Sequence, residues 1–144
     1  MRDKYLTKAY IQRKVDADGS KINLNISIPS TVGLKNYPFL LIIQSTVKDH
    51  TKLTIYPIFR KKIIKLSLFG QNVSDEAINI LSKILKRYEI IHSSGFLMKQ
   101  KQLFYECYIN LSLSDVKSKD LKASLDKIKN IFKEIKIEEI GLNN

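Results

Sequence analysis

The sequence predicts an α+β protein in which N-terminal β-hairpins precede a ferredoxin-like domain of the order β-α-β-β-α-β. Two observations lead to this fold class. Between residues 62 and 141 the apolar residues alternate between a period of two and a period of 3.6, as strands and helices require. The two predicted helices are also spaced so that both can bury their apolar stripes on one face of a four-stranded antiparallel sheet. The predicted domains are 1–60, an all-β domain, and 61–144, the ferredoxin-like domain.

The elements of the ferredoxin-like domain follow from this periodicity. Strands are predicted at 62–69, 89–99, 102–113 and 135–140, and helices at 74–88 and 117–134. Each helix has one apolar stripe and one basic stripe, and we interpret the basic stripes as solvated faces. They contain Lys83, Lys86 and Arg87 on the first helix, and Lys119, Lys122, Lys129 and Lys133 on the second.

The N-terminal part reads as four strands. Residues 5–15 and 20–28 form a predicted hairpin around Asp18-Gly19, since glycine tolerates the positive φ that such a turn needs. The continuous apolar run in 37–47 predicts a strand that is buried on both faces. A fourth strand at 52–59 returns beside it, and the basic cluster that begins at Arg60 marks the predicted boundary with the next domain.

Charge is the strongest compositional signal in the 144 residues. The formal net charge is +11, and residues 1–60 hold ten Lys and Arg against four Asp and Glu. Such an excess suits the phosphate backbone of a nucleic acid or an anionic membrane surface. A chain rich in Lys, Ile and Asn can also reflect a biased genome composition, so charge alone leaves both interpretations open.

Several classes of protein are disfavoured by the composition. Cys107 is the only cysteine, so an intrachain disulfide is impossible, and the two histidines form no zinc pattern. The charged N-terminus does not resemble a signal peptide, and the longest apolar run (39–43) is too short to span a membrane. We therefore expect a cytoplasmic, soluble protein without a metal or other cofactor. About sixty residues make too small a core alone, so the N-terminal domain is expected to need a second chain.

The N-terminal motifs resemble those of a known family. They are R-K-V-D-A-D-G (13–19), S-I-P (27–29), G-L-K-N-Y-P-F-L-L-I (33–42) and K-L-T-I-Y-P-I (52–58). Together, over residues 8–59, they resemble the swapped-hairpin DNA-binding domain of the AbrB/SpoVT family. The chain departs from the family pattern in having only residues 30–32 where the family has a short helix, and Tyr37-Pro38 where it usually has Gly-Asp.

This resemblance implies a dimer in which two chains interleave their hairpins into one barrel that binds duplex DNA. A basic β-surface would then contact the phosphates, and an arginine there could also make bidentate contacts to a guanine edge. The same cations equally suit solvated strand faces that discourage aggregation. The residues assigned to DNA binding are Lys8, Arg13, Lys14 and Lys21.

The ferredoxin-like domain resembles the ACT and related regulatory families in its element order and in the glycine that ends its first strand. That resemblance implies a site for an amino acid or another small ligand in the loop after this strand. The matching residues are Gly70, Gln71, Asn72, Ser74 and Asp75. Ser74, Asp75 and the following Glu76 are equally consistent with simple capping of the first helix.

The third strand of the ferredoxin-like domain gives a second candidate surface. If Leu103, Tyr105 and Cys107 face the helices, then Phe104 and Tyr108 lie on the open face of the sheet. We predict that this face is an oligomer interface, or is covered by the N-terminal strands, because a monomer seldom leaves such a patch exposed. An RNA-stacking platform is the alternative, although Glu106 would repel phosphate at its centre.

No carboxylate pair, nucleophile with a base, phosphate loop or metal cluster stands out, so the sequence favours a regulator over an enzyme. The leading hypothesis is a dimeric DNA-binding transcriptional regulator with a C-terminal domain for ligand sensing or dimerisation. Two alternatives remain open: a ferredoxin-like ligand-binding or assembly module without DNA binding, and an RNA-binding protein that uses the open sheet face.

Overall fold

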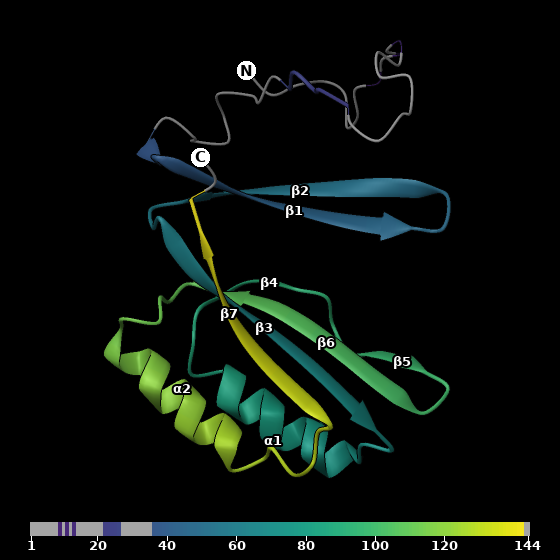
Figure 1. The fold of residues 1–144 in the computed structure, drawn as a ribbon, viewed down its shortest axis with the longest axis vertical. Helices are drawn as coiled ribbons and strands as arrows, with labels where there is room; N and C mark the ends of the chain where they lie inside the picture. The colour runs from purple at the N-terminus through teal and green to yellow at the C-terminus, as the bar shows by residue number, and fades with distance from the viewer. Residues whose placement is uncertain (1–8, 10, 12, 14–21, 27–35, 143–144) are drawn as a thin grey trace. The chain divides into compact units, whose positions relative to one another are not determined.

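The computed structural model describes residues 9, 11, 13, 22–26 and 36–142 (Figure 1). The chain divides into two compact units, 1–38 and 39–144. The described α-helices and β-strands all belong to the second unit, in the order β1-β2-β3-α1-β4-β5-β6-α2-β7. The predicted α+β class, a hairpin sheet followed by a ferredoxin-like β-α-β-β-α-β sheet with two helices, is therefore confirmed.

Strands β1 (Phe39–Val47) and β2 (His50–Ile58) form an antiparallel two-stranded sheet joined by a two-residue turn. Both strands were predicted, but burial of β1 on both faces was wrong. Leu41 and Ile43 are buried, whereas Leu40 and Ile42 on the opposite face are 46% and 59% exposed. The physical reason is that a hairpin with a single layer beneath it can bury only one of its faces.

The ferredoxin-like sheet is antiparallel with the strand order β4-β6-β3-β7, and β5 also pairs with β6. Its strands are β3 (Lys62–Gln71), β4 (Ile90–Ser93), β5 (Leu97–Lys99), β6 (Gln102–Ile109) and β7 (Glu134–Gly141). Helices α1 (Asp75–Leu85) and α2 (Val116–Asp126) cover one face of this sheet (Figure 1).

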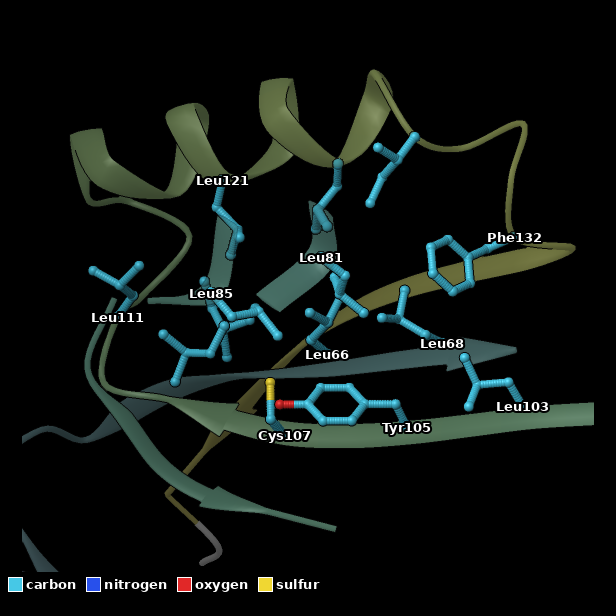
Figure 2. Close-up of a cluster of buried hydrophobic side chains, with 14 residues drawn as sticks. Leu66, Leu68, Leu81, Leu85, Leu103, Tyr105, Cys107, Leu111, Leu121 and Phe132 are labelled. Carbon is cyan, nitrogen blue, oxygen red and sulfur yellow. The ribbon is translucent and has the colours of Figure 1, made fainter. Parts of the chain in front are cut away.

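The main core lies between these helices and the sheet (Figure 2). Alternate residues of β3 and β6 point into it, among them Leu66, Leu68, Leu103 and Cys107. The helices supply the predicted apolar stripes, with Leu81 and Leu85 from α1 and Leu121 and Leu125 from α2. The basic residues assigned to the opposite stripes are exposed, as expected of solvated faces.

Several predicted elements of the ferredoxin-like domain differ from the structure, and the strand predicted at 102–113 ends at Ile109. The strand predicted at 89–99 is split into β4 and β5, because Gly95 has a φ of +72° and Phe96 turns to stack on Tyr105 at 4.7 Å between ring centroids. The helix predicted at 117–134 ends at Asp126. Turns with bonds from Ile128 N to Leu125 O and from Ile131 N to Ile128 O follow it. These turns still bury Ile128 and Phe132, so the buried apolar stripe continues beyond the end of the helix.

Most of the hairpin predicted over residues 5–15 and 20–28 lies outside the described residues. Residues 22–26, which are described, do not form a strand, and Ile22, Leu24 and Ile26 are exposed. No helix in the described part of the chain is long and apolar enough to cross a membrane.

Candidate functional site

The loop after β3, where a ligand site was predicted, packs tightly and leads directly into the capped start of α1. Gly70 is buried, and a Cβ atom at this position would clash with the side chain of Val73. Asn72 has a φ of +52° and its N–H donates to Lys101 O at 2.9 Å. Ser74 Oγ accepts a 3.1 Å hydrogen bond from Ala77 N and so caps α1.

Gln71 and Asp75 are exposed, and Asp75 lies in the first turn of α1. The geometry thus has a structural explanation in helix capping, which the sequence had left open beside ligand binding. None of these loop residues lines the cleft between the hairpin and the open face of the sheet. Their role in binding a ligand stays a prediction.

The open face of the sheet, opposite the helices, has the predicted composition. Along β6, Leu103, Tyr105 and Cys107 are buried toward the helices, whereas Phe104 and Glu106 are exposed. Tyr108, also on the open face, is half-buried. The parity predicted for this strand is therefore confirmed.

The hairpin of β1 and β2 packs over one end of this open face. Leu41 and Ile43 of β1 form a small apolar cluster with Ile63 of β3, which is only 1% exposed. The partly buried residues around this cluster are Tyr56, Ile58, Ile91, Tyr108 and Ile140. Cover by the chain's own strands thus reaches Tyr108, while Phe104 remains 40% exposed.

One polar contact accompanies this apolar cluster. The hydroxyl of Tyr56 in β2 and Nδ1 of His92 in β4 are hydrogen bonded at 2.8 Å, and the two rings are tilted with centroids 5.5 Å apart. The sequence did not predict this contact, because the two residues are 36 positions apart and no local spacing relates them.

Beyond the cluster, the hairpin and the open face enclose a cleft of two adjoining hollows of about 460 and 370 Å³. Both hollows are lined by Gln44 and Ser45 of β1, by Glu106 of β6, and by Ser94 and Leu97. The larger hollow adds Phe69 and Phe104 together with Glu134 and Lys136 of β7, and the smaller adds Lys52, Lys65 and His92. The cleft therefore has an aromatic end and a basic end.

Charges at the basic end are only partly compensated. Lys65 Nζ lies 3.7 Å from Glu106 Oε2, and the two side chains are 24% and 51% exposed. The same ammonium lies 5.8 Å from the centroid of the Tyr108 ring. Lys52 has no carboxylate within 4.0 Å among the residues that the structure describes. One ammonium group is thus in excess at this end of the cleft.

The aromatic end is formed by cross-strand neighbours. Phe69 and Phe104 are paired in the register of β3 and β6, and their ring centroids lie 5.0 Å apart at an interplanar angle of 41°. Lys133 Nζ lies 5.7 Å from the centroid of the Phe69 ring. Leu97 beside them is 56% exposed, so this end presents apolar surface to whatever enters the cleft.

The buried cysteine belongs to the other face of the sheet. Burial raises the pKa of the Cys107 thiol to about 11 and that of the neighbouring Tyr105 hydroxyl to about 12. The hydroxyl of Tyr105 lies beside the sulfur of Cys107 in the core (Figure 2). Cys107 is therefore a protonated thiol in the core, on the face of the strand predicted for it, and it does not line the cleft.

The predicted DNA-binding residues can be placed only in part. Arg13 is exposed, while Lys8, Lys14 and Lys21 lie outside the described residues. Their assignment stays a prediction. Within the described ranges, no group of three or more His, Cys, Asp or Glu side chains could hold a metal ion.

Comparisons with known proteins add little to this geometry. No protein-family model matches the chain, and no curated protein matches it at a significant level. Among solved structures, the chain is similar to a formyltetrahydrofolate deformylase from Pseudomonas putida KT2440, with 11% identity and a TM-score of 0.38. The match covers 58% of this chain and 29% of that one, and a similarity of this extent supports no functional argument.

Proposed function

We propose that this protein is a DNA-binding transcriptional regulator whose ferredoxin-like domain binds a small ligand, and that it acts as a homodimer or higher homo-oligomer. The observation that carries the ligand-binding part of the proposal is the cleft between the hairpin and the open sheet face, which has the size and mixed chemistry of a small-molecule site. The DNA-binding part is supported by the excess of Lys and Arg in residues 1–60. The proposed role is binding and regulation, without catalysis.

The position of the hairpin in the sequence suggests how the two activities would be linked. The segment that carries the proposed DNA-binding residues ends where β1 begins, at residue 39. A ligand that contacts both the hairpin and the sheet would hold the hairpin in one position. Binding energy at the cleft would thereby act on the element to which the basic segment is attached.

The test is a mobility shift on duplex DNA over a series of salt concentrations. Phosphate-driven binding weakens steeply with salt, and each lost phosphate contact lowers the log–log slope by about 0.9. Replacing Arg13 and Lys14 together by Ala is expected to reduce both affinity and slope. The matched control replaces Lys119 and Lys122, on the exposed face of α2, by Ala. A control that abolishes binding while Arg13→Ala/Lys14→Ala does not would contradict the proposed surface.

A second candidate is a ligand-binding or assembly module without DNA binding. The outer face of the hairpin favours it, since Leu40, Ile42 and Leu53 are exposed there and offer an apolar surface to another chain. This candidate predicts no shift of duplex DNA at any salt concentration. RNA binding through the open sheet face has less support, because Glu106 lies exposed in the centre of that face.

A further inference from the structure

Resting on the ligand-binding role proposed above, we propose that the cleft takes an organic carboxylate with an aromatic or bulky apolar body. The proposal concerns the surface between β1 and the open face of β3 and β6, and it is independent of the loop after β3. It follows from the charge balance of the basic end, the aromatic pair at the other end and the strand register that separates them.

At the basic end, the Lys65 ammonium can make a closer contact with a ligand carboxylate than it makes with Glu106. Lys65 Nζ and Glu106 Oε2 are 3.7 Å apart, which is too long for a direct hydrogen bond. A ligand carboxylate could approach Lys65 to hydrogen-bonding distance and make the shorter, charge-assisted contact. Lys52, which lines the same hollow, supplies a second positive charge. These charges favour an anionic group at this end.

The neighbouring polar side chains can orient that group. His92 lines the hollow with its Nδ1 already bonded to Tyr56, so the orientation of its ring is held from the hairpin side. Thr54 of β2 adds a hydroxyl group from the hairpin wall, and Lys65 of β3 adds its ammonium from the sheet wall. A carboxylate bound here would therefore have donors from both the hairpin and the sheet.

The register sets the length of the ligand. Lys65 pairs with Tyr108, Ser67 with Glu106, and Phe69 with Phe104, so these rows follow one another along the sheet. Successive rows on one face are two residues, or about 7 Å, apart. Lys65 lies two rows from Phe69, and its ammonium comes within 3.7 Å of Glu106 Oε2, which belongs to the row between them. A carboxylate joined to a ring by two or three carbon atoms spans this separation.

Glu106 further limits the class of ligand that the cleft can bind. Its carboxylate lies between the basic end and the aromatic end and would repel a ligand that carries several negative charges, such as a nucleotide. It would tolerate a monocarboxylate and could accept a hydrogen bond from an ammonium group on the same molecule. Simple aryl carboxylates and aromatic amino acids share the required chemistry, so binding must be measured for both.

The experiment measures binding to the full chain by titration calorimetry, with three probes of one shape. These are 3-phenylpropanoate, L-phenylalanine and 3-phenylpropylamine. We expect 3-phenylpropanoate or L-phenylalanine to bind and the amine not to bind. If L-phenylalanine binds more tightly than 3-phenylpropanoate, the ligand is an amino acid whose ammonium contacts Glu106. The reverse order identifies a simple aryl carboxylate.

Two variants locate the site. Lys65→Gln is expected to weaken binding of the carboxylate probe about tenfold, the loss of one charge-assisted contact. Lys62→Gln is the matched control, since Lys62 Nζ also lies 3.7 Å from a glutamate, Glu139, but does not line the cleft. Phe69→Ala is expected to weaken the binding of the two aryl carboxylate probes as well. Thermal melts establish that each variant is folded.

The proposal is overturned if neither carboxylate binds, if the amine binds in their place, or if Lys62→Gln weakens binding as much as Lys65→Gln. The regulator hypothesis fails separately, when no duplex DNA is shifted at any salt concentration. The two outcomes are therefore distinguishable, because the calorimetric titration contains no DNA and the mobility shift needs no ligand.

Discussion

The hydroxyl of Tyr56 and Nδ1 of His92 lie 2.8 Å apart and connect the hairpin to the edge strand β4 of the ferredoxin-like sheet. The two residues are partly buried, so water competes poorly for either partner. A double-mutant cycle with Tyr56→Phe and His92→Phe is expected to give a coupling free energy of about 1 kcal/mol. Urea unfolding of the four proteins measures it. A coupling near zero would mean that the hairpin is held by its apolar contacts alone.

The turn between β5 and β6 predicts a stabilising substitution. Gln100 and Lys101 have φ values of +51° and +65°, which cost a non-glycine residue about 1 kcal/mol. Lys101→Gly is expected to raise the melting temperature, since glycine adopts this conformation without strain. The matched comparison is Gly95→Ala, at a φ of +72° with open space around it, which is expected to lower the melting temperature. Changes of the same sign in both variants would contradict this explanation.

The buried pair of Cys107 and Tyr105 predicts a loss of stability at alkaline pH. Burial raises the pKa of Cys107 from 9.0 to about 11 and that of Tyr105 from 10.0 to about 12. The folded state thus holds these protons more tightly than the unfolded state. The stabilisation is complete below pH 9.0 and is lost as pH rises through about 11 and 12. Denaturation at a series of pH values is expected to show a shallower alkaline decline in Cys107→Ala than in the wild-type protein.

Phe104 and Tyr108 are predicted to lie in an oligomer interface, and Phe104 remains exposed within one chain. Phe104→Asp is therefore expected to shift sedimentation toward the monomer, because assembly would bury an unpaired charge. Ile42→Asp, at an exposed apolar residue on the outer face of the hairpin, is the matched control. If Ile42→Asp dissociates the assembly and Phe104→Asp does not, the interface lies on the hairpin.

Much of the ferredoxin-like domain could be predicted because its local patterns agree with its tertiary structure. Alternation along 103–109 assigned each residue of β6 to its correct face, and Ser74 at the start of α1 has the capping bond that its position suggests. In these elements the spacing of apolar residues and the chemistry of the caps point to the same result.

The candidate cleft could not be predicted, because it depends on contacts between distant segments. Residues 39–43 are all apolar, so their sequence does not show which of them face the sheet. Only the packing of Leu41 and Ile43 on Ile63 determines it. The split at Gly95 and Phe96 was missed for a similar reason, since the stacking of Phe96 on Tyr105 is a tertiary contact.

The burial of Cys107 also allows the separation of the helices from the sheet to be measured by the reactivity of this native thiol. The chain contains a single cysteine, and in the native state its sulfur is fully enclosed between the sheet and the helices. A thiol-specific reagent can therefore react only when the helices and the sheet separate, so the reaction rate reports how often they separate. The same rate measured with a bound ligand would show, without any engineered label, whether occupancy of the opposite face of the sheet restrains this side of the molecule.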